Sequence, residues 1–130
     1  MAKITNIAEV SFKSESSWGT YDGLVVSLDN GNDVKVGISD GQSCCENWGY
    51  ITSEDNYEGF IGAELYSVAG VDSKLAHIEL QEIHEGDMIF VNFNTSEGVL
   101  QFVAYNEHNG YYSHEAVLIV GGNLQESWTL

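Results

Sequence analysis

The chain has 130 residues, of which 20 are acidic and four are lysine, and it contains neither arginine nor proline. Its formal net charge of −16 disfavours direct binding to nucleic acid or to an anionic membrane, and favours a positively charged partner. With 43% hydrophobic and 12% aromatic residues, the chain is too apolar for a disordered acidic tail. Its length fits one acidic, β-rich domain over residues 1–130.

The cellular location follows from what the sequence lacks. No apolar run approaches the roughly 20 residues that span a bilayer, and the first residues lack the apolar centre of a secretory signal. Cys44 and Cys45 are adjacent, and neighbouring cysteines seldom form a disulfide because their Cα atoms are too close. We therefore expect a cytoplasmic protein in a reducing compartment.

Short apolar segments, rich in β-branched and aromatic residues, recur between glycines along the chain. Each has the length of a β-strand. The predicted strands are residues 4–12, 24–28, 33–38, 64–71, 77–83, 88–93, 99–105 and 111–120. Both faces of 99–105 are largely apolar, which predicts a central position in a sheet.

Three turns connect these segments into predicted hairpins. Asn30-Gly31 and Asn109-Gly110 each favour a two-residue type I′ turn, and a third hairpin is expected at residues 95–98. If Asn109-Gly110 forms such a turn, Tyr105 lies opposite His114. The last three strands then form a meander.

One short helix is predicted after residue 52. Ser53 is a typical N-cap, and the acidic residues after it suit the positive end of the helix dipole. Apolar side chains follow at helical spacing at Tyr57, Phe60 and Ile61, and Gly62 would end the helix. The predicted fold is mainly β (α+β): an antiparallel sheet, or a small sandwich or barrel, of seven or eight strands with one short helix.

Three sequence motifs occur in a recognisable order. Residues 39–48 read Ser-Asp-Gly-Gln-Ser-Cys-Cys-Glu-Asn-Trp, residues 60–62 read Phe-Ile-Gly, and residues 105–113 read Tyr-Asn-Glu-His-Asn-Gly-Tyr-Tyr-Ser. Their order and spacing over 33–117 resemble a family of small bacteriophage proteins of unknown function. The family often has a histidine just before the double cysteine, where this chain has Asp40 or Gly41. The resemblance implies a phage or prophage origin, and hence a bacterial host cytoplasm, but no activity.

The acidic residues predict an electrostatic interface. Duplex DNA carries about one charge per 1.7 Å, so 16 charges match roughly 27 Å of duplex, near the diameter of one domain. By analogy with other acidic phage proteins, we expect an inhibitor of a host defence nuclease, such as a CRISPR effector, that binds its basic nucleic-acid surface. The candidate contacts are Glu46, Glu54, Asp55, Glu58, Glu82, Glu85 and Asp87, with Trp48 and Tyr111 as aromatic anchors.

Other interpretations stay open at this point. The acids can be solvated loops and strand edges, and Trp48 can be a core residue. A zinc-containing β protein would draw ligands from Cys44, Cys45 and His114, although no Cys-x-x-Cys or His-x-x-x-His spacing is present. A cysteine-dependent enzyme using Cys45 and His114 is the third alternative, but the chain lacks familiar nucleophile motifs, so we expect no catalysis.

Overall fold

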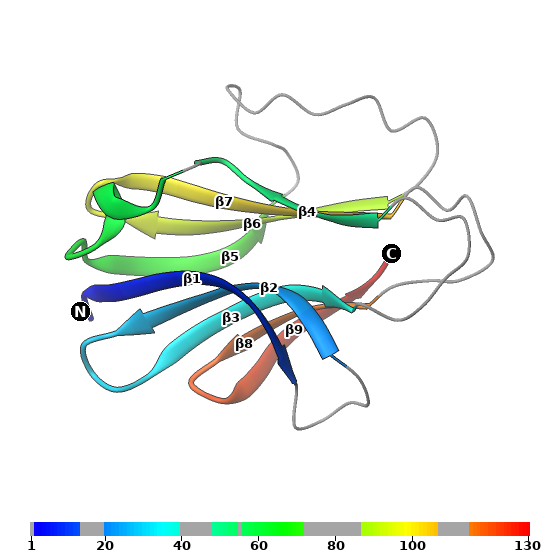
Figure 1. Ribbon diagram of the computed structural model, residues 1–130, viewed down its shortest axis with the longest axis horizontal. Helices are drawn as coiled ribbons and strands as arrows, with labels where there is room; N and C mark the ends of the chain where they lie inside the picture. Colours follow the sequence, from blue (N-terminus) through cyan, green and yellow to red (C-terminus); the bar gives the residue numbers. More distant parts are fainter. Residues whose placement is uncertain (1, 14–19, 40–47, 55, 72–86, 107–114) are drawn as a thin grey trace.

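Figure 1 shows the computed structural model, in which two antiparallel β-sheets form two layers. The structure describes residues 2–13, 20–39, 48–54, 56–71, 87–106 and 115–130, with only the backbone of residues 48, 87 and 129. The elements are β1 (Ile4–Lys13), β2 (Thr20–Leu28), β3 (Asp33–Ser39), β4 (Trp48–Thr52), the 3-10 helix η1 (Glu58–Phe60), β5 (Leu65–Val71), β6 (Asp87–Thr95), β7 (Gly98–Asn106), β8 (Glu115–Val120) and β9 (Asn123–Thr129).

The strand order is β1-β2-β3-β8-β9 in one sheet and β4-β7-β6-β5 in the other. The prediction of a mainly β fold is therefore confirmed, although the described residues alone contain nine strands rather than seven or eight. In the described chain, one isolated bridge, Lys3 to Glu64, joins the residue before β1 to the residue before β5. The described strands thus form an open sandwich and not a closed barrel.

The main core lies between the two sheets. Alternate residues of a strand point to opposite faces, so every second side chain of β2 and β3 reaches the interior. Leu24, Val36 and Phe102 are completely buried there. Leu130 at the end of the chain is also buried, and Figure 1 shows this end between the two layers.

A second apolar cluster covers the outer face of the five-stranded sheet. It contains Phe12, Tyr21, Val117 and Ile119, and the rings of Phe12 and Tyr21 stack with centroids 5.8 Å apart. Gly37 makes this packing feasible, because a Cβ there would lie 2.9 Å from two Phe12 ring atoms. The Phe12 side chain therefore covers a part of β3 that has no side chain of its own.

The first predicted hairpin is present, with a different loop. β2 and β3 pair antiparallel around Asn30-Gly31. The Gly31 amide donates to Leu28 O and the Leu28 amide donates to Asn32 O, which closes a three-residue loop ending at Gly31 with φ 87°. The prediction of a two-residue type I′ loop was therefore wrong. The observed pattern is typical of a type I turn followed by a left-handed glycine.

The predictions for β6 and β7 agree with the structure. These strands form a hairpin in which Thr95 pairs with Gly98. The Thr95 hydroxyl donates to Gly98 O at 2.7 Å and accepts from the Glu97 amide at 3.1 Å. β7 lies between β4 and β6, so its predicted central position is confirmed.

The predicted meander of the last three strands is wrong. β7 belongs to the four-stranded sheet and β8 to the five-stranded sheet, so the chain crosses between layers after Asn106. Tyr105 pairs with Gly49 and Met88 rather than with His114. The Asn109-Gly110 turn itself lies outside the described residues, as does the predicted strand 77–83.

The predicted helix at 53–61 is reduced to the three residues of η1. Ser53 does not cap a helix, because its amide donates to Gln101 O and its hydroxyl accepts from the Gln101 amide, both at 2.9 Å. These bonds continue the pairing of β4 with β7, and a long-range contact thus overrides the local capping signal. Phe60 is buried, whereas Ile61 is 44% exposed.

Candidate functional site

Two of the predicted partner-binding acids have described side chains. Glu58 is exposed in η1, and Glu54 is half-buried just after β4, where its carbonyl accepts a hydrogen bond from the Thr52 hydroxyl. They lie close in sequence on the same connection. The structure thus leaves this part of the predicted acidic cluster at the surface.

Two further predicted residues occupy equivalent positions at one end of the four-stranded sheet. Trp48 in β4 and Asp87 in β6 both pair with Asn106 of β7, from opposite sides. The backbones of two residues that are distant in sequence are thereby brought to the same level of the sheet. The remaining predicted residues lie outside the described chain: Glu46, Asp55, Glu82, Glu85, Tyr111, and the metal candidates Cys44, Cys45 and His114.

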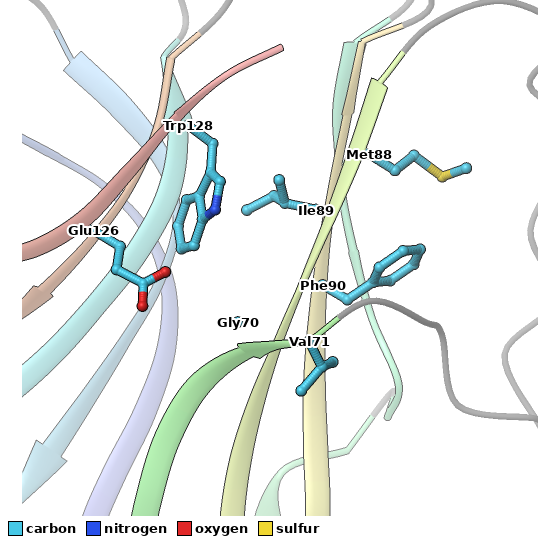
Figure 2. A pocket seen from close by; sticks show the side chains of 7 residues that line it. All are labelled: Gly70, Val71, Met88, Ile89, Phe90, Glu126 and Trp128. Atoms are coloured by element: carbon cyan, nitrogen blue, oxygen red, sulfur yellow. The ribbon is translucent and has the colours of Figure 1, made fainter.

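A hollow of about 340 Å³ opens between β9 and the β5–β6 pair. It is lined by Gly70, Val71, Met88, Ile89, Phe90, Glu126 and Trp128. Figure 2 shows the Trp128 ring and the Ile89 side chain pointing toward each other across the gap, whereas Met88 and Phe90 point away from it. Trp128 and Ile89 thus supply apolar side-chain surface to the hollow, whose lining also includes backbone and the carboxylate of Glu126.

Glu126 brings a negative charge to this hollow. Its side chain is exposed, and Figure 2 shows its carboxylate directed toward Gly70. A Cβ at Gly70 would lie 3.1 Å from Cζ2 of Trp128 and 3.4 Å from Oε2 of Glu126. The carboxylate and the indole ring therefore lie side by side beneath the bare backbone of β5.

A second hollow of about 340 Å³ also has Glu126 in its wall. The apolar part of its lining comes from the margin of the main core: Leu28, Val34, Leu65, Val68, Leu118 and Val120. Together the two hollows follow β5 from Leu65 to Val71. We call these two hollows, which share Glu126 in their linings, the β5–β9 groove.

A tyrosine and two carboxylates lie where β4 meets β1 and β2. The Tyr50 hydroxyl donates to Oε1 of Glu9 at 3.3 Å, and Ser11 donates to Asp22 at 2.6 Å. Burial, the charge of Glu9 and the hydrogen bond to it raise the pKa of Tyr50 from 10.0 to about 12. This phenol is therefore a hydrogen-bond donor at neutral pH that joins the two sheets, and it is poorly suited to act as a base.

Carboxylates outnumber lysines on the described surface. Lys35 lies 4.0 Å from Asp33, within its own strand. In the described part of the chain, no group of three His, Cys, Asp or Glu side chains is arranged to hold a metal ion. The described residues hence offer negatively charged carboxylates beside apolar and aromatic side chains.

Sequence reasoning missed β9 and with it the β5–β9 groove. A usable signal was present: Gly121-Gly122 separates two short segments, and the second has Glu126 and Trp128 at a spacing of two. Both glycines have positive φ, 59° and 85°, as the type I′ turn requires. The pairing of β8 with β9 places Glu126 and Trp128 on the same face.

The fold and these surfaces define an acidic β-sandwich domain with an open groove beside one edge strand. The family model described as Domain of unknown function (DUF7448) matches residues 2–118, and the chain belongs to this family. No curated protein and no solved structure shows significant similarity to it. Among the described residues, none of the helical structure is long and apolar enough to cross a membrane.

Proposed function

We propose that this protein is a non-enzymatic, phage- or prophage-encoded inhibitor that binds a basic host protein. The target class is a nucleic-acid-binding defence nuclease, such as a CRISPR effector. The observation that carries the proposal is the net charge of −16, which persists on the described surface as exposed carboxylates with few lysines nearby. A basic nucleic-acid channel is complementary to such a surface.

The inhibitor acts by occupying the channel that the nucleic acid would otherwise enter. Glu58 and Glu54 supply part of the predicted contact, and the other predicted acids supply the rest: Glu46, Asp55, Glu82, Glu85 and Asp87. The exposed carboxylates steer association over distances near the Debye length, about 8 Å at physiological salt. Binding of this kind competes with DNA or RNA and weakens as salt increases.

The test uses the purified full-length chain on a solid support and a panel of purified restriction enzymes and CRISPR effectors. We expect one nuclease to be retained at about 0.05 M NaCl and released at about 0.5 M NaCl. Preloading that nuclease with its nucleic acid should prevent capture. An acidic protein of similar size and charge, unrelated in sequence, serves as the control for non-specific retention.

Two results would contradict the proposal. A complex that resists both high salt and preloaded nucleic acid would show that binding does not depend on charge at the channel. Failure of every nuclease in the panel to bind would remove the proposed target class.

A further inference from the structure

We propose that the β5–β9 groove binds a lysine or arginine side chain from an extended basic segment of the partner protein. Glu126 is the counter-ion, and the Trp128 ring packs against the alkyl stem and charged head of the incoming residue. This inference rests on the proposed function, because it names the local site at which a basic partner is held. The groove was not among the predicted contacts.

The placement of Trp128 and Glu126 against β5 depends on Gly70. A side chain there would lie 3.1 Å from the Trp128 ring and 3.4 Å from the Glu126 carboxylate. Gly70 is not among the glycines with positive φ, so the local backbone conformation does not itself demand glycine. What the glycine contributes is a close approach of the ring and the carboxylate to the bare backbone of β5.

The chemistry of the groove favours a cation with an apolar stem. No described residue forms a hydrogen bond or an ion pair with the Glu126 carboxylate. An ammonium or guanidinium group binds to a carboxylate and also to the face of an indole ring. The methylene groups of lysine and arginine pack on apolar surface while the charged end stays at a polar group. The adjoining Leu65 and Val68 provide such apolar surface.

β5 provides the edge along which an extended segment can lie. Among the described strands its neighbour in the sheet is β6; on its other side the Leu65 amide donates to Ala2 O, and the residues after Leu65 border the groove. The sequence of β5, Leu-Tyr-Ser-Val-Ala-Gly-Val, contains no charged residue and no proline. Natural edge strands are usually protected by such residues, and an unprotected edge is a site for the addition of a strand.

The size and charge of the groove favour a peptide segment over an enclosed small ligand. Each hollow is about 340 Å³, near the lower limit of small-molecule pockets, and both share one carboxylate. Alternate side chains of an added strand would point into the groove. A segment with a basic residue at alternate positions thus matches the arrangement.

The test is a titration of the full-length protein with the peptide acetyl-Val-Lys-Val-Lys-Val-amide, followed by NMR or calorimetry at low salt. The matched peptide has norleucine in place of lysine. We expect Glu126→Gln to weaken binding of the lysine peptide about tenfold. Glu97→Gln removes the same charge from the exposed β6–β7 turn and should change affinity less than about twofold.

A second variant tests the shape of the groove without changing charge. Gly70→Ala places a methyl group against Trp128 and should weaken the peptide by about fivefold or more. Denaturation midpoints of all variants verify that each is folded. Equal binding of the norleucine peptide, or equal losses in Glu126→Gln and Glu97→Gln, would overturn the inference.

The nuclease capture experiment separates this inference from the proposed function. If Glu126→Gln and Glu97→Gln retain the nuclease equally, the groove is not the site of binding although the inhibitor proposal stands. If the lysine peptide binds in the groove but no nuclease is captured, the proposed target fails while the binding of a basic segment stands.

Discussion

At the scale of single residues, Tyr50 joins the two sheets. Its hydroxyl donates to Glu9 of β1, and its ring stacks on Phe102 of β7 with centroids 5.1 Å apart. A pKa raised from 10.0 to about 12 means that the folded state holds the phenolic proton more tightly than the unfolded state does. The stabilisation is complete below pH 10 and is lost as the pH rises through about 12.

We therefore predict that Tyr50→Phe makes stability less sensitive to alkaline pH. The free energy of unfolding of the wild type should fall more steeply than that of the variant between pH ~10 and ~12. Urea denaturation at several pH values measures this difference. Tyr66→Phe, which removes a tyrosine that is 51% exposed, is the control and should follow the wild type. Parallel curves for the wild type and Tyr50→Phe would contradict the prediction.

At the scale of elements, the end of β4 is extended by a side chain. The Ser53 hydroxyl accepts a hydrogen bond from the amide of Gln101, which is fully buried in the central strand β7. Backbone pairing and this side-chain contact together hold the residue after β4 in an extended arrangement. The sequence around this serine had instead predicted that it begins a helix.

Ser53→Ala should destabilise the protein by about 1–2 kcal/mol, because it removes a hydrogen bond to a buried amide. Hydrogen exchange should speed up at the Gln101 amide, which loss of a helix cap would not affect. Ser127→Ala on the exposed part of β9 is the matched control and should change stability by less than about 0.5 kcal/mol. Unchanged exchange at Gln101 would show that the serine hydroxyl does not support β7.

The elements that sequence could predict are those with local signals. The Asn30-Gly31 and 95–98 turns and the apolar 99–105 strand lie within short windows of the chain. β4 has five residues, and its partner β7 is more than 40 residues away, so no local pattern indicates the pairing. The assignment of β7 and β8 to different sheets depends on packing between layers, which an Asn-Gly turn does not report.

Of the candidate site, the sequence predicted only the negative charge and not the arrangement of the residues. A negative surface follows from composition, but the meeting of Gly70, Glu126 and Trp128 requires β5 and β9 to be brought together by the sandwich. Glu126 was one acid among 20 in the sequence. Its neighbours, rather than its charge, distinguish it from the others.

At the scale of the whole molecule, the net charge of −16 opposes compaction. We predict that the unfolding temperature rises as NaCl increases from about 0.02 M to about 0.5 M, because screening reduces repulsion among the carboxylates. Differential scanning calorimetry measures this shift. A variant with Glu9→Gln, Glu97→Gln and Glu126→Gln should show a smaller rise, and a fall in unfolding temperature with salt would contradict the prediction.

The five-stranded sheet combines β1 to β3 with β8 and β9, which are distant in sequence, because β3 pairs with β8. The amide of Glu115 donates to the Ser39 hydroxyl across 76 residues, and the four-stranded sheet is encoded between them. During synthesis, β1 to β3 emerge before β8, and β3 lacks its partner on the second side until β8 has left the ribosome. Such a high contact order slows folding and leaves a strand edge accessible to aggregation or to chaperones until β8 has been synthesised.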